Sequence, residues 1–183
     1  MSVLNNKPQM FTIQFPSNFW YPEVVEMWTP LIERMRLPYQ DLNDFMNAQI
    51  QSVVFPSMSL ELATQQRGQY EVNYPSGKEL EVHMDKTLKI TFKLTESYLS
   101  YWIVFSQMDR YLHYVNDYKN LKRCWMEPIE LGFLTDSGFN LLNFTFREIT
   151  PTDTSSLTLS YAATVASYNT FDWTLKYNLF DIK

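Results

Sequence analysis

The sequence predicts an α+β fold in which a mostly antiparallel β-barrel or sandwich carries one long packed helix and a helical insertion near its N-terminus. Many short segments alternate apolar and polar side chains, as half-buried strands do. One stretch, residues 97–118, keeps apolar side chains at helical spacing. The chain of 183 residues is long enough for one well-cored domain. Its 4 glycines argue against phosphate loops and dinucleotide-binding folds, which depend on glycine.

The N-terminal quarter combines a strand with helices. Residues 10–15 alternate and predict a strand. Residues 21–48 carry apolar side chains at helical spacing, and we expect them to form the helical insertion. Pro30 suits a first helical turn capped by Thr29, so one kinked helix and two short helices both fit the pattern. Asp41 is placed to cap a further short helix.

Strand patterns return in the middle of the chain. Residues 50–55 and 58–64 predict strands. Residues 65–86 are polar and rich in tyrosine, with turn residues at 75–77, and predict an extended hairpin or loop outside the core. Residues 88–94 place four apolar side chains on one face and polar ones on the other, which predicts a half-buried strand.

The long helix is expected to begin at a cap formed by Thr95 or Ser97. We expect its apolar stripe to pack on the sheet, because such a stripe is more often core than a cofactor site. The stripe consists of Tyr98, Tyr101, Trp102, Phe105, Met108, Leu112 and Val115.

The C-terminal third predicts further strands. An Asp-Ser-Gly turn at residues 136–138 should join two of them as a hairpin. The last strand has one apolar face, which could be buried in the core, and a second face that could contact another surface. The expected order is a strand at 126–134, a strand at 141–146, a loop at 149–153, a strand at 156–161 and a final strand at 171–180.

Charge and cysteine content limit the function. The net charge of −5 argues against a general nucleic-acid binder, because contact with phosphates needs clustered lysine and arginine. The single cysteine, Cys124, cannot form an internal disulfide and suits a reducing compartment. There is neither a signal-peptide pattern nor an apolar run of about 18 residues, so we expect cytoplasmic synthesis and no membrane association.

No residue pattern indicates catalysis, a cofactor or a metal. His83 and His113 lie far apart without partner motifs, and we interpret both as structural or exposed. Glu79 and Glu81 could lie side by side on a strand, but a solvated strand face is the favoured interpretation of such a pair. We therefore expect a protein that is not an enzyme.

The order of the segments carries a family resemblance. MFTIQF at residues 10–15 is followed by QSVVFPSMSLELA at 51–63 and by LKITFKLTESYLSYWIVFSQM at 88–108. The chain closes with TFDWTLKYNLFDI at 170–182. This series resembles the tail tube proteins of contractile-tailed bacteriophages, whose tube-like fold is shared with the haemolysin-coregulated protein of type VI secretion. The helical stretch 21–48 departs from the compact core of that family.

The resemblance implies a structural virion protein, made in the host cytoplasm and built into the phage tail. Six copies would form a ring, rings would stack head to tail, and genomic DNA would pass through the lumen without specific binding. Sheath, baseplate or tail terminator proteins would be further partners. The hairpin at about residues 65–86 would reach the neighbouring ring, with Arg67, Tyr70, Tyr74 and Lys78 as contact residues.

Two alternatives stay open. A tube initiator, a baseplate adaptor or a type VI secretion ring protein would share the tube-like fold, and the insertion at 21–48 suits such an adaptor. A monomeric β-barrel that binds a small apolar ligand belongs to a different class, and the aromatic content of 16% permits it.

Overall fold

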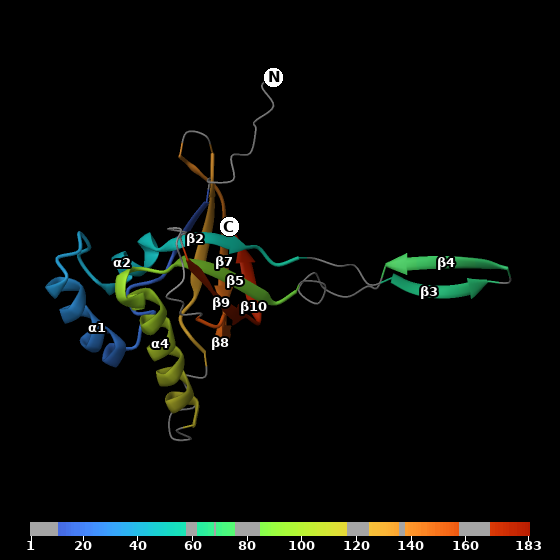
Figure 1. Ribbon diagram of the computed structural model, residues 1–183. Coiled ribbons are helices and arrows are strands. Elements are labelled where there is room, and N and C mark those ends of the chain that lie inside the picture. The colour runs from blue at the N-terminus through green and yellow to red at the C-terminus, as the bar shows by residue number, and fades with distance from the viewer. Residues whose placement is uncertain are drawn as a thin grey trace.

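The computed structural model describes residues 11–57, 62–67, 69–75, 85–116, 125–135, 138–157 and 169–183. It has the α+β fold that the sequence predicts. Two antiparallel sheets form a sandwich, the helices gather on one side of it, and a two-stranded hairpin projects from the opposite side (Figure 1). The sheets do not close into a barrel within the described residues, so the sandwich is the form of the prediction that is confirmed.

Each sheet has four strands. The first sheet has the order β1-β6-β7-β10 and the second the order β2-β5-β9-β8, with every neighbouring pair antiparallel. The first comprises β1 (Phe11–Gln14), β6 (Ile129–Leu134), β7 (Asn140–Arg147) and β10 (Leu179–Ile182). The second comprises β2 (Ile50–Val54), β5 (Thr87–Lys93), β9 (Thr170–Lys176) and β8 (Thr150–Thr154).

Aromatic rings fill the core. Phe92 of β5 stacks on Phe171 of β9, with 5.4 Å between ring centroids. Trp173, also on β9, stacks on Trp20 at 6.1 Å, and Trp20 precedes the first helix. Of the four apolar side chains predicted to share a face at 88–94, Leu88, Ile90 and Phe92 are fully buried in β5, and Leu94, just beyond the strand, is half-buried. Rings from the sheets and from the helical side therefore share one core, which fixes the helices on the sandwich.

The insertion at 21–48 folds as helices, as predicted. One helix, α1 (Pro22–Arg34), contains Pro30 in its interior, so of the two alternatives the single helix is correct and Thr29 caps nothing. The following helix, α2 (Leu42–Ala48), begins at the predicted cap, where Asp41 Oδ1 accepts a hydrogen bond from the backbone nitrogen of Asp44 at 2.7 Å.

The long helix, α4 (Leu99–Asn116), follows the short 3-10 turn η1 (Glu96–Tyr98). Of the two predicted cap residues, Thr95 contacts the first turn, because its hydroxyl accepts a hydrogen bond from the backbone nitrogen of Ser100 at 3.2 Å. The predicted buried stripe is wrong for most of its members. The face that is buried consists of Leu99, Ser100, Ile103, Val104, Gln107 and Tyr111, whereas Trp102, Phe105, Leu112 and Val115 are exposed.

Gln107 explains which face turns inward. Its side chain accepts a hydrogen bond from the backbone nitrogen of Tyr21 and donates one to the carbonyl of Phe19, both at 3.0 Å. These two backbone groups lie before α1 and are buried, so they need polar partners. Gln107 and the apolar residues beside it therefore turn inward together, and Trp102, Phe105, Leu112 and Val115 are left exposed.

Three further expectations are corrected. The final strand at 171–180 is two strands, because the chain crosses from the second sheet to the first at Tyr177 and Asn178. The loop predicted at 149–153 contains strand β8, which tolerates Pro151 because it lies at a sheet edge. The strand predicted at 156–161 begins with irregular backbone, and its remainder lies outside the described residues.

The projecting hairpin is also placed differently. Its strands are β3 (Leu62–Arg67) and β4 (Tyr70–Pro75), so this chain reversal lies between Arg67 and Tyr70; of the turn predicted at 75–77, residues 76 and 77 lie outside the described residues. We call this hairpin the arm. The β6–β7 hairpin predicted from the turn at 136–138 is confirmed by the antiparallel pairing of its strands.

Candidate assembly surfaces

The arm brings three of the four predicted contact residues to one face. Residues directly opposite each other in an antiparallel pair share a face. Arg67 lies opposite Tyr70, and Tyr74 follows at a spacing that returns its side chain to the same face. The Tyr70 side chain is 78% exposed. Lys78, the fourth predicted contact residue, lies outside the described residues.

The other face of the arm is polar. Thr64 lies opposite Asn73 and donates a hydrogen bond to its Oδ1 atom at 2.9 Å, and Gln66 lies opposite Glu71. At about 3.3 Å per residue, six-residue strands make an arm roughly 20 Å long. The arm thus presents a basic, aromatic face on a structure that extends clear of the body (Figure 1). Tyrosine and arginine are enriched in protein interfaces.

The sheet edges are a second candidate surface. Strands β2 and β8 border the second sheet, and β1 and β10 border the first. Because each sheet has an even number of antiparallel strands, its two edges run in opposite directions. A copy rotated about an axis along the strands would therefore bring its β2 against β8 in antiparallel orientation. Unpaired edges of this kind favour pairing with another chain.

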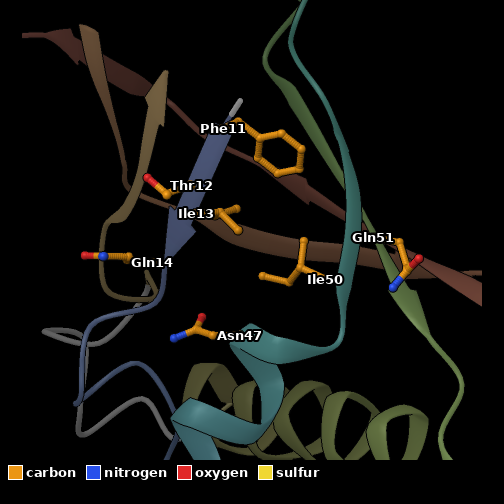
Figure 2. Close-up of a pocket in the computed structure, with 7 residues that line it drawn as sticks. All are labelled: Phe11, Thr12, Ile13, Gln14, Asn47, Ile50 and Gln51. Atoms are coloured by element: carbon orange, nitrogen blue, oxygen red, sulfur yellow. The ribbon is translucent and has the colours of Figure 1, made fainter. Parts of the chain in front are cut away.

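A groove separates the edges β1 and β2. Its volume is about 480 Å³. Figure 2 shows the side chains of Phe11, Ile13 and Ile50 turned toward one another across it, with Asn47 at one end. Thr12, Gln14 and Gln51 complete the lining. On this side of the sandwich an apolar strip therefore lies between two strand edges.

The exposed stripe of α4 is a third surface. Tyr101, Phe105, Met108, Leu112 and Val115 follow one another in alternating steps of four and three residues, the spacing of a coiled-coil seam. Phe105 is 50% and Leu112 58% exposed, Val115 is also exposed, and Tyr101 and Met108 are half-buried and pack against the core. We call these five residues the α4 seam. Exposed apolar side chains that follow one another along a helix in this way indicate a protein contact.

The outward face of the second sheet is polar and carries charges of both signs. Lys89 of β5 and Asp172 of β9 form a salt bridge of 2.8 Å, and the Thr91 hydroxyl donates to Asp172 at 2.7 Å. The hydrogen bond from Lys89 is the main cause that lowers the pKa of Asp172 below its usual value; burial opposes this change. Lys176 and Asp153 share this face. The acidic side chains therefore offset part of the positive charge of the lysines on this outward face.

The residues considered for chemistry are not brought together. His113 lies on α4, largely exposed and 3.7 Å from Asp109, and His83, Glu79, Glu81 and Cys124 lie outside the described residues. In the part of the chain that the structure describes, no three histidine, cysteine or acidic side chains gather as metal ligands. No helix there is both long and apolar enough to cross a bilayer. Sequence reasoning missed the α4 seam as a surface, although its strict three-and-four spacing was a signal.

No protein-family model and no curated protein sequence matches the chain. Solved structures are similar to it over about three quarters of its length. A chain of the anti-feeding prophage baseplate has a TM-score of 0.48 at 13% identity, covering 74% of this chain and 78% of that chain. A chain of the PVC sheath-tube complex, an extracellular contractile injection system in its extended state, has a TM-score of 0.44 at 14% identity, covering 73% and 80%. An Hcp protein has a TM-score of 0.39 at 10% identity, covering 73% and 75%.

Proposed function

We propose that the chain is a structural subunit of a bacteriophage tail tube, without catalytic activity, and that six copies form rings that stack head to tail. The observation that carries the proposal is the arm, a projecting hairpin whose exposed face combines Arg67, Tyr70 and Tyr74. A lone two-stranded hairpin is only marginally stable in water. An arm of this length with an aromatic face is accounted for when a neighbouring subunit covers it.

Ring closure follows from the edges of the second sheet. This sheet leads into the arm through β2 and β5. If β8 of each copy meets β2 of the next, the strands of six copies form one antiparallel barrel without edges. The contact joins two different surfaces of identical chains, which is the arrangement that generates closed rings and, along the axis, open filaments.

The polar face of the second sheet would then line the channel. A duplex carries one charge per about 1.7 Å of its axis, so a continuous basic wall would bind it. The pairing of Lys89 with Asp172 removes part of the positive charge from this face. Such a wall would let genomic DNA pass without holding it.

The α4 seam is assigned to a surrounding tail protein such as a sheath subunit, which would present a helix to it. Its three-and-four spacing accepts a helix by knobs-into-holes packing. A baseplate adaptor, a tube initiator or a type VI secretion ring protein would use the same surfaces. Copy number separates these roles, because a tube subunit is among the most abundant proteins of a tail and an initiator fills about one ring.

The alternative of a monomeric barrel with an apolar ligand is disfavoured by the core. Phe92, Phe171, Trp173 and Trp20 occupy the region where such a ligand would be held. A ligand carrier would also stay monomeric as its concentration rises, which light scattering after size-exclusion chromatography measures directly.

Removing the arm tests the proposal. Residues 64–73 would be replaced by an Asn-Gly turn, which closes the hairpin at the Ala63–Tyr74 pair. We expect a folded, soluble protein that no longer forms tubes in negative-stain electron microscopy, whereas the unaltered chain forms them. Alanine at Thr64 and Asn73, on the polar face, is the matched control and should leave tubes intact. Long tubes from the shortened chain would refute the role of the arm.

A further inference from the structure

We propose that the arm of one copy docks into an acidic hollow at the start of α1 in the next copy along the tube, so that the helical insertion is the receptor for stacking. This inference rests on the proposed function and names the surface that receives the arm. The acidic hollow has a volume of about 470 Å³ and lies between α1 and the segment that precedes β6. Residues that matter here are Trp20, Val25, Glu26, Trp125 and Glu127.

The hollow offers an aromatic and apolar surface with acidic side chains around it. Trp125 is 50% exposed, and Trp20 and Val25 lie deeper. Glu26 and Glu127 are exposed, and neither takes part in the salt bridges found among the described residues. A volume in this range suits the burial of small groups such as tyrosine rings.

Charge favours this hollow over three others among the described residues. The groove between β1 and β2 has no charged side chain in its lining. The hollow beside α2 and the start of α4 contains Lys93, which would repel Arg67. A hollow next to β1 combines Glu127 and Glu130 with Arg147 and Lys183. The acidic hollow has glutamates and no basic residue in its lining, so it complements the basic face of the arm.

The contact residues of the arm have chemically suitable partners in the acidic hollow. Arg67 lies opposite Tyr70 on the arm. Like Glu26 and Glu127 in the hollow, it takes part in no ion pair among the described residues. Arginine pairs with carboxylates and also stacks on tryptophan rings, so Glu26, Glu127 and Trp125 are suitable partners. Tyr70 and Tyr74 would cover the apolar floor. Anchors of this kind contribute most of the binding energy at interfaces.

The position of the hollow fits head-to-tail stacking. The arm projects from one side of the body, while α1 lies on the opposite side with the other helices (Figure 1). A contact between opposite ends of identical copies repeats indefinitely, which is the requirement for a filament of stacked rings. If the receptor lay at the same end of the subunit as the arm, two rings would pair face to face and the stack could not continue.

Charge exchange tests the inference. The arm variant is Arg67→Glu, the hollow variant is Glu26→Arg with Glu127→Arg, and the third chain carries all three changes. Tube formation would be followed by electron microscopy and sedimentation over a range of protein concentrations. We expect the arm and hollow variants each to raise the concentration needed for tubes by about tenfold or more, and the combined chain to recover most of this loss. Glu71→Arg on the polar face of the arm and Glu33→Arg on the exposed side of α1 are the controls, and both should form tubes normally.

Each outcome has a distinct meaning. Thermal unfolding of every variant shows whether the fold persists, since all altered side chains are exposed. Recovery in the combined chain supports the docking. A hollow variant that assembles normally, or a combined chain that stays as defective as the arm variant, overturns the docking while leaving the tube intact. If the unaltered chain itself forms neither rings nor tubes, the proposed function fails and the docking fails with it.

Discussion

The side chain of Gln107, in the middle of α4, accepts a hydrogen bond from the backbone nitrogen of Tyr21 at a distance of 3.0 Å. The same amide donates to the carbonyl of Phe19, also at 3.0 Å. Two residues 86 positions apart in the chain are thus joined by a buried polar contact. This contact joins the segment that enters α1 to the long helix and lies on the face of α4 that is buried.

Replacing Gln107 by leucine should lower the free energy of unfolding by about 3 kcal/mol, because two buried backbone groups would lose their partners. Chemical denaturation of the purified chain measures the change. Gln51→Leu, at an exposed position of β2, is the control and should stay within about 0.5 kcal/mol of the unaltered chain. Equal stability of the two variants would show that the Gln107 contacts do not determine the packing of α4.

Lysine at Phe105 and Leu112 should destroy the α4 seam without unfolding the protein. Both side chains are half exposed or more, so we expect a stability change of no more than about 0.5 kcal/mol for each replacement. Tubes should still form from the purified chain. In a strain that makes this variant in place of the natural subunit, electron microscopy should show bare tubes in place of complete tails.

Asp109→Lys, next to the seam on the exposed side of α4, is the matched control for that experiment. It changes charge without removing apolar surface and should leave tail assembly unaffected. Complete tails from the Phe105 and Leu112 variant would exclude the seam as the contact with a surrounding protein.

Lysine at Val54 should prevent ring closure. Val54 lies on the edge strand β2, is 56% exposed and faces Lys89 of β5, so a lysine there should destabilise the monomer by no more than about 1 kcal/mol. In the ring its charge would be placed against β8 of the neighbour, and charged side chains on edge strands oppose strand addition. Sedimentation velocity should show a loss of hexamers. Val54→Thr, which keeps the branched shape without charge, should assemble, and a hexameric lysine variant would argue for a different ring contact.

Asp172→Asn should reduce stability near neutral pH by about 0.5–1 kcal/mol, since it removes the ion pair with Lys89. The folded state lowers the pKa of Asp172 from its usual 3.8, so the carboxylate stabilises the fold above that pH. As pH falls below 3.8 through the lower folded pKa, the contribution disappears and the two chains should become equally stable. Denaturation curves across this range provide the measurement, with Asp153→Asn as the control. A difference that persists in strong acid would mean that Asp172 acts by shape and not by charge.

The strand and helix types could be predicted where one residue pattern left no alternative. The alternation in β5 predicts a buried face, and Asp41 predicts the cap of α2; both are confirmed. The arm was predicted as a hairpin, but its turn was assigned to 75–77 because proline and glycine are strong turn residues. The observed reversal lies between Arg67 and Tyr70, where Gly68 in the sequence is itself a turn residue, so the local signal was present and the stronger one at 75–77 was preferred to it.

The sequence alone determined that the chain makes an α+β domain with a long helix, a helical insertion and a tyrosine-bearing hairpin, because these features follow from side-chain spacing within each segment. Tertiary structure decided which face of α4 is buried, where the last strand crosses between the sheets, and that Arg67, Tyr70 and Tyr74 share one face. Each of these depends on partners distant in the chain. Both faces of α4 carry apolar side chains, and the buried one is distinguished by hydrogen bonds to backbone outside the helix, those of Gln107 with Phe19 and Tyr21 and that of Ser100 with Lys93.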